Sequence, residues 1–223
     1  AWLEPHFMDE DGTLRMSVHA LVVETPDHRI VVDTCIGNDK DRMPMKNWHH
    51  MQTRFLDDFE AAGFARDAID QVLCTHLHVD HVGWNTMRVE DRWVPTFPNA
   101  RYLVAEKEFE FWRDQDGDEL NAQVFTDSVA PVFDAGLMDL VEPEHRICPE
   151  VDFVPTHGHT PGHVSVRIRS RGEEALITGD FLHHPCRVFA ACADTPTLVI
   201  GTHFAGATAG RIVRDGDAYR LDV

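Results

Sequence analysis

The sequence predicts an α+β fold in which two β-sheets pack face to face and helices cover their outer faces. Short apolar segments bounded by turn residues recur along the 223 residues and have the length and composition of strands. Segments with helical spacing of apolar residues occur in two clusters between them. Since a sheet must bury its apolar face, this pattern favours packed layers. The length suits one domain spanning residues 1–223.

The positions of turn residues and apolar periods define the expected elements. Strands are expected at residues 18–23, 29–32, 71–74, 92–97, 101–104, 140–141, 151–154, 164–168, 211–214 and 219–221, and helices at 53–62, 105–114 and 121–135. Thr53 is expected to cap the first helix, and Pro131 to kink the last, with Phe133 facing inward. Residues 1–16 are expected to form an edge hairpin or arm, and residues 84–86 a polar turn.

Composition excludes several classes of partner. The net charge of −18 predicts an acidic surface, which disfavours nucleic acids and anionic membranes. No apolar span of eighteen residues occurs, so the cytoplasm is the default expectation, although a leader before Ala1 stays open. The five cysteines are scattered without a Cys-x-x-Cys pair, so neither a thiolate zinc site nor a disulfide framework is expected.

Four side chains able to bind metal fall within six positions directly after an apolar strand. They are His76, His78, Asp80 and His81. Zinc, iron and manganese accept imidazole nitrogen and carboxylate oxygen as ligands. Beyond a strand end, residues two apart point the same way, so His76 and His78 can bind one ion while Asp80 and His81 turn towards a second. The alternative is a solvated polar loop with charge-paired histidines.

This block resembles the His-x-His-x-Asp-His signature of the metallo-β-lactamase superfamily. That family has three further ligands in a fixed order, and the chain offers a candidate for each. They are His163 in Gly-His-Thr-Pro-Gly-His, Asp180 after Leu-Ile-Thr-Gly, and His203 after Leu-Val-Ile-Gly-Thr. The resemblance runs from about Val18 to Arg214 and implies a four-layer αββα sandwich, the metallo-β-lactamase-like fold.

The resemblance also implies a ligand assignment for two divalent ions. One ion takes His76, His78 and His163, the second takes Asp80, His81 and His203, and Asp180 bridges them. Nitrogen and oxygen donors suit Zn²⁺, with iron, manganese and cobalt left open. In this assignment His159 braces its loop, and His157 is exposed.

Further residues are candidates for supporting the ligands or lining a substrate pocket. Asp33 ends a strand, and its carboxylate can accept the N–H of a ligating histidine or, alternatively, cap a turn. The other candidates are Trp48, Trp84, Phe181, His183 and His184, of which the last two also suit a plain surface position.

Two loops bear on the shape of the pocket. The irregular segment 38–50 carries Met43, Met45, Trp48, His49 and His50, which either form a pocket wall or lid or pack onto the core through Trp48. Residues 186–196 leave room for only a turn or two, where relatives have a longer loop and a full helix. Either that element is trimmed or residues are missing from the chain.

The resemblance implies a binuclear metal-dependent hydrolase that acts through a metal-bridging hydroxide, with Asp80 as the proton carrier. A small ester or lactone, such as an acyl-homoserine lactone, fits the Trp- and Met-bearing loop and the lack of a basic cluster. Alternatives are a phosphotriester (organophosphate) hydrolase, an iron-dependent oxidoreductase and a non-catalytic metal-binding protein. The expected partner is a small molecule, and a homodimer stays open. Antibiotic β-lactamase activity is disfavoured, because the best-known zinc β-lactamases carry cysteine where this chain has Asp180.

Overall fold

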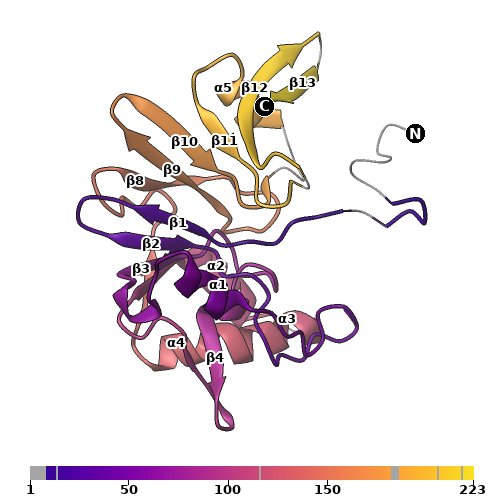
Figure 1. Ribbon diagram of the computed structural model, residues 1–223, viewed down its shortest axis with the longest axis vertical. Coiled ribbons are helices and arrows are strands. Elements are labelled where there is room, and N and C mark those ends of the chain that lie inside the picture. Colours follow the sequence, from indigo (N-terminus) through magenta and orange to yellow (C-terminus); the bar gives the residue numbers. More distant parts are fainter. Residues whose placement is uncertain (1–8, 14, 116, 182–185, 205, 217) are drawn as a thin grey trace. The chain divides into compact units, whose positions relative to one another are not determined.

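The computed structural model describes residues 9–13, 15–115, 117–181, 186–204, 206–216 and 218–223, without the side chains of 186–188 (Figure 1). The chain divides into two compact units, each with its own sheet and hydrophobic core. The first unit comprises residues 20–142, and the second comprises residues 1–19 together with 143–223.

The first unit contains a mixed five-stranded sheet in the order β1-β2-β3-β6-β7. Its strands are β1 (Leu21–Glu24), β2 (Arg29–Val32), β3 (Gln71–Leu73), β6 (Arg101–Ala105) and β7 (Met138–Val141). The β1 strand pairs antiparallel with β2, and the remaining pairs are parallel. Parallel strands place their carboxyl ends at one edge of a sheet, where α/β proteins commonly build their sites. The carboxyl ends of β2 and β3 lead into Asp33 and the histidine block.

Helices pack against this sheet through one core. They are α1 (Phe55–Ala61), α2 (Glu106–Arg113), α3 (Glu119–Val124), the π-helix η3 (Phe125–Val129) and α4 (Ala130–Asp134). Phe59, Phe109 and Val132 from these helices join Val72 and Tyr102 of the sheet in the core. Two short 3₁₀ helices, η1 (Arg66–Ala68) and η2 (Gly83–Asn85), and the hairpin β4 (Thr86–Val89)–β5 (Arg92–Pro95) complete the unit.

The second unit contains a six-stranded sheet in the order β13-β12-β11-β10-β9-β8. Its strands and its helix are β8 (Val151–Pro155), β9 (Val164–Ser170), β10 (Glu173–Ile177), α5 (Cys186–Cys192), β11 (Leu198–Ile200), β12 (Ala209–Asp215) and β13 (Ala218–Asp222). Among the described strand pairs of this sheet, β10 and β11 pair in parallel and the others pair antiparallel. Figure 1 shows β12 and β13 as the yellow hairpin at the end of the chain. Leu176, Val199 and Ile212 of the sheet share a small core with Phe181 and Cys192.

The structure confirms most expected elements and corrects four expectations. The segment 121–135 is not one continuous helix, because η3 interrupts it and Pro131 lies at the start of α4, where a missing N–H costs little. Phe133 was expected to face inward and is 45% exposed instead. The turn expected at residues 84–86 is the 3₁₀ helix η2 leading into strand β4. Thr53 does not cap α1; its N–H and hydroxyl both donate to Asn38 Oδ1.

The loop before α1 is anchored by a buried ionic cluster. Lys40, Arg42 and Asp127 are each at most 1% exposed. Arg42 donates two hydrogen bonds to the Asp127 carboxylate, at 2.7 and 2.8 Å. Lys40 Nζ donates to Thr86 Oγ1 at 2.8 Å and lies 3.8 Å from the centre of the Trp93 ring. Burial lowers the pKa of Lys40 to about 7, against the attraction of Asp127.

In the described part of the chain, no helix has the length and apolar character needed to cross a membrane.

We predict that the free energy of unfolding rises between pH 7 and pH 9 in the wild-type protein, but not in Lys40→Met. The unfolded lysine keeps its proton over this range while the folded lysine loses it, so unfolding takes up a proton and becomes less favourable as pH rises. The expected slope difference is at most about 1.4 kcal/mol per pH unit, measured by urea unfolding.

The exposed Lys46 lies on the same loop and provides a matched control. The Lys46→Met variant should keep the wild-type slope. Equal slopes in all three proteins would show that Lys40 stays protonated in the folded state.

Candidate metal site

The histidine block of the first unit follows β3 as a tight turn. His76 and His81 are fully buried, whereas His78 and Asp80 are partly exposed. His76 Nε2 lies 3.1 Å from His78 Nδ1, and His81 Nε2 lies 3.8 Å from Asp80 Oδ1. Two ligands that each bind one tetrahedral zinc ion at about 2.0–2.1 Å stand about 3.3 Å apart. The His76–His78 pair is close to this separation, and the His81–Asp80 pair is wider.

Asp33 fixes the orientation of this block. Its Oδ1 accepts the Thr75 N–H at 2.8 Å, and its Oδ2 accepts the Thr75 hydroxyl and the His81 Nδ1–H, both at 2.8 Å. With the ring proton of His81 on Nδ1, its lone pair is on Nε2, the atom that lies near Asp80. The contact between a carboxylate and a candidate ligand, expected from the sequence, is present.

Gly83 lets the backbone after Asp33 cross the block at contact distance. A Cβ atom at Gly83 would lie 1.8 Å from the carbonyl oxygen of Ile36, so no other residue fits. The Gly83 N–H donates to Cys35 O at 2.7 Å, and the Thr34 N–H donates to His81 O at 2.6 Å. These bonds tie both strand ends together behind the histidines.

Glu108 is a further buried residue at this site, and the sequence analysis missed it. Its Oε1 accepts the N–H of Leu77 at 3.1 Å and the indole N–H of Trp112 at 2.7 Å. The Trp112 ring packs edge-on against His78, with ring centres 5.2 Å apart. A glutamate four residues before a tryptophan on the inner face of α2 was the available signal.

In the second unit, Asp180 and His203 follow the parallel strands β10 and β11 and so lie at the same edge of the sheet. His203 Nε2 lies 3.1 Å from Asp180 Oδ1. The Nδ1–H of His203 donates to the carbonyl oxygen of Ser17 at 2.8 Å, which leaves the lone pair on Nε2. His159 Nε2 lies 3.5 Å from the other Asp180 oxygen, Oδ2. The three side chains converge with donor spacings again near 3.3 Å.

His163 has a different environment from that expected of a ligand. It is fully buried, its Nδ1 lies 2.8 Å from Thr156 Oγ1, and its Nε2 accepts the Asp180 N–H at 2.9 Å. Thr156 Oγ1 also lies at hydrogen-bond distance, 3.0 Å, from Ser165 Oγ. The Ser165 hydroxyl in turn donates to Thr178 O at 2.9 Å. Both ring nitrogens are therefore engaged within the second unit. In this geometry it is His159, and not His163, that directs a ring nitrogen at the Asp180 carboxylate.

The other candidate residues lie in varied environments. Trp84 is buried and stacks on Phe55, with ring centres 5.1 Å apart. Trp48 and Met45 pack against the core of the first unit, as in the alternative interpretation of their loop, and Phe181 is buried in the core of the second.

The remaining candidates are exposed or pair at the surface. Met43 is 49% exposed, and His50 and His157 are exposed. His49 Nδ1 lies 3.0 Å from Asp41 Oδ1. His183 and His184 lie outside the described residues.

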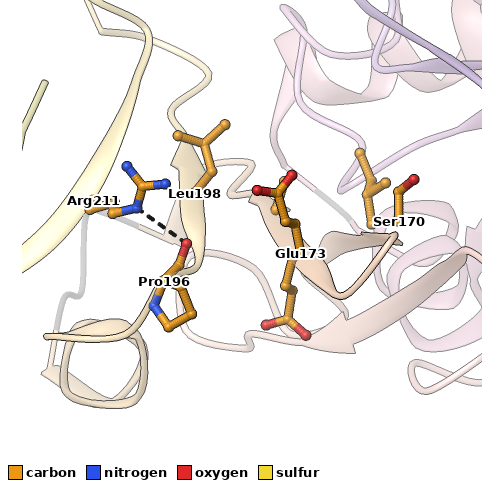
Figure 2. A pocket seen from close by; sticks show the side chains of 8 residues that line it. Ser170, Glu173, Pro196, Leu198 and Arg211 are labelled. Carbon is orange, nitrogen blue, oxygen red and sulfur yellow. Dashed lines mark hydrogen bonds between the residues drawn. The ribbon is translucent and has the colours of Figure 1, made fainter.

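A surface pocket on the second unit is separate from these ligands. Figure 2 shows Ser170, Glu173, Pro196, Leu198 and Arg211 around it, with Arg211 Nε donating to the carbonyl oxygen of Pro196 at 3.3 Å. The pocket lies where β10 and β11 begin, whereas Asp180 and His203 follow the points where these strands end. It is therefore at the opposite end of the strands from the candidate ligands.

We predict that Asp33→Asn weakens zinc affinity by about 10–100-fold, the usual cost of losing a partner that orients a metal ligand. The carboxylate fixes the His81 ring, and a neutral amide accepts its N–H less strongly. Competition with a chromophoric chelator measures the affinity. The exposed Asp91 serves as a charge-matched control, since Asp91→Asn should bind zinc as the wild type does. Unchanged affinity in folded Asp33→Asn would show that Asp33 only shapes the turn.

Comparisons with known proteins place this geometry in context. A curated N-acyl homoserine lactonase from a Bacillus species is 23% identical over 130 residues, which are 58% of this chain and 45% of that protein. The chain thus aligns with less than half of the length of this relative. The structure of AidC, a dizinc quorum-quenching lactonase, has a TM-score of 0.75 and 19% identity, and the match covers 92% of this chain and 79% of that one.

The structure of AbOPH, described as a hydrolase in the beta lactamase superfamily, has a TM-score of 0.79 and 22% identity over 99% of this chain and 84% of that one. These structural matches confirm the predicted α+β fold class, with its metallo-β-lactamase-like αββα sandwich. The sequence profile of the metallo-beta-lactamase superfamily matches residues 14–217, and so spans both units. The chain therefore belongs to the metallo-beta-lactamase superfamily.

Proposed function

We propose that this chain is a metal-dependent hydrolase that binds two divalent ions, most simply Zn²⁺, and cleaves a small ester or lactone. The observation that carries the proposal is the set of nitrogen and oxygen donors that follow strand ends in both units at ligand-like spacing. The proposed ligands are His76, His78, Asp80, His81, His159, Asp180 and His203.

His159 takes the place that the resemblance gave to His163. His159 Nε2 points at the Asp180 carboxylate, which itself faces His203. His163 instead accepts the Asp180 N–H through Nε2, the only ring nitrogen that carries a lone pair when Nδ1–H donates to Thr156. A lone pair shared with a backbone N–H is poorly available for a cation. We therefore assign His163 to holding the Asp180 backbone in place.

When bound, zinc ions supply an acidified water and polarise the bond to be cleaved. The chain's own residues hold and orient the ligands and move a proton. Asp33 and the Ser17 carbonyl set the tautomers of His81 and His203, so each ring presents Nε2. Asp80 is partly exposed, so its carboxylate is within reach of a substrate, and we assign it the transfer of a proton to the leaving group.

Two observations support an ester or lactone as the substrate. The Bacillus relative is described as an N-acyl homoserine lactonase, and AidC was solved with an acyl-homoserine product. The net charge of −18 disfavours polyanionic substrates, because they would be repelled on approach. A neutral acyl lactone fits both observations.

We predict that the zinc-loaded protein opens an N-acyl homoserine lactone with proton release in a pH-stat, and that a chelator abolishes the reaction. Asp80→Asn should lower kcat by about 10²–10⁴-fold, the usual contribution of a positioned proton carrier. Asp91→Asn is the control and should be fully active.

Turnover of a phosphotriester of similar size without lactone opening would favour the organophosphate alternative instead. Activity only in an iron-loaded, oxygen-dependent form would favour an oxidoreductase. Full kcat in Asp80→Asn with both metals bound would remove Asp80 from the mechanism.

A further inference from the structure

A second cavity on the second unit lies next to a proposed ligand. Its volume is about 430 Å³, within the range of roughly 300–1,000 Å³ for small-molecule sites. It is lined by Arg15, His203, Phe204, Gly206, Ala207, Leu221 and Val223. Four of these side chains are apolar, and His203 is the one shared with the ligand group. The lining is thus suited to an apolar group attached to a molecule that reacts at the metal site.

Two glycines shape the walls of this cavity. A Cβ atom at Gly201 would lie 2.5 Å from the Phe204 ring, so the ring lies directly against the end of β11. A Cβ atom at Gly210 would lie 2.9 Å from both Leu221 Cγ and Val223 Cγ1. The absence of these side chains lets the phenyl ring and the last strand approach the sheet closely. The positions of Phe204, Leu221 and Val223 in the cavity wall therefore depend on the close backbone approach that these glycines allow.

The polar residues at the cavity do not select a charged ligand. The Nε of Arg15 donates to Asp9 Oδ1 at 2.7 Å, so the charge of the guanidinium is already paired. His203 makes its Nδ1 bond to Ser17 and directs Nε2 towards Asp180. No other ionisable side chain lines the cavity among the described residues. An uncharged alkyl group in this cavity therefore leaves no charged side chain newly unpaired, and it gains contact with the apolar walls.

We propose that this cavity is the subsite for the alkyl chain of the substrate's acyl group, with Phe204, Ala207 and Leu221 setting the preferred chain length. The inference rests on the proposed function, because it assumes that the acyl carbonyl reacts beside His203. It narrows the substrate class to esters or lactones whose acyl group carries an extended alkyl chain. Each buried methylene strengthens transition-state binding by about fourfold until the cavity is filled.

The test uses the full zinc-loaded chain and two series of probes. The first series is N-acyl homoserine lactones from butanoyl to decanoyl, followed by kcat/KM. The second series is straight-chain carboxylates from butanoate to decanoate, whose binding is measured by calorimetry and does not depend on turnover. Ala207→Trp fills the cavity, and Leu221→Asn makes its wall polar. Ala218→Trp, an exposed alanine on the same hairpin and outside the cavity, is the matched control.

We expect kcat/KM and carboxylate affinity to rise with chain length in the wild type and in Ala218→Trp. In Ala207→Trp and Leu221→Asn, neither kcat/KM nor carboxylate affinity should increase with chain length, although both variants should still bind butanoate. Equal affinity for butanoate and decanoate, or an unchanged rise in Ala207→Trp and Leu221→Asn, would overturn the subsite. A rise in carboxylate affinity that Ala207→Trp removes, without any lactone turnover, would support the subsite and reject the proposed hydrolysis.

Discussion

The contact of Asp33 with Thr75 and His81 is the interaction on which the candidate site of the first unit depends. One carboxylate accepts three hydrogen bonds at 2.8 Å and is itself only 2% exposed. A buried carboxylate is stable only if such donors replace water. The contact therefore fixes both the turn after β3 and the tautomer of a histidine. Gly83 supports it by allowing the backbone after Asp33 to pass close behind the block.

In the second unit, different residues hold a proposed ligand in the same way, through hydrogen bonds to a buried polar side chain. His163 is buried and holds the Asp180 N–H, while Thr156 and Ser165 extend the hydrogen-bonded chain to the Thr178 carbonyl. The loop that carries Asp180 is thereby tied to β9 at a point away from its carboxylate. In each unit, a buried polar side chain that we place outside the ligand set holds a proposed ligand in position. Such supporting residues typically account for one to two orders of magnitude of metal affinity.

Most of the fold and one half of the site could be predicted from the sequence. Strand periodicity and turn residues located β2, β3, β6 and the C-terminal hairpin, because these features are local. The block from His76 to His81 was evident because four donors follow one strand. The resemblance pointed to His163 rather than His159, and both lie in one Gly-His-Thr-Pro-Gly-His stretch. Our assignment of His159 instead rests on the hydrogen bonds and contacts of the fold.

Other features depend on contacts between distant segments. In the sequence, Lys40 and Arg42 have the character of solvated charges in a polar loop. In the fold both are buried and donate hydrogen bonds to Asp127, which lies over 80 positions later in the chain. The π-helix that carries Asp127 has no local sequence signal beyond the nearby Pro131. Glu108 resembles any helical surface glutamate until the Leu77 N–H is found against it. Tertiary pairing of this kind cannot be inferred from periodicity alone.

We assign His159, Asp180 and His203 as the ligands of the second unit, with His163 outside the set. The most direct measurement is the zinc content per chain of the wild type, His159→Ala and His163→Gln after equilibrium dialysis. Glutamine retains an acceptor for the Asp180 N–H, so His163→Gln should bind two ions, as the wild type should. His159→Ala should lose one. Two ions in His159→Ala together with the loss of one in His163→Gln would contradict this assignment and restore His163 as the ligand.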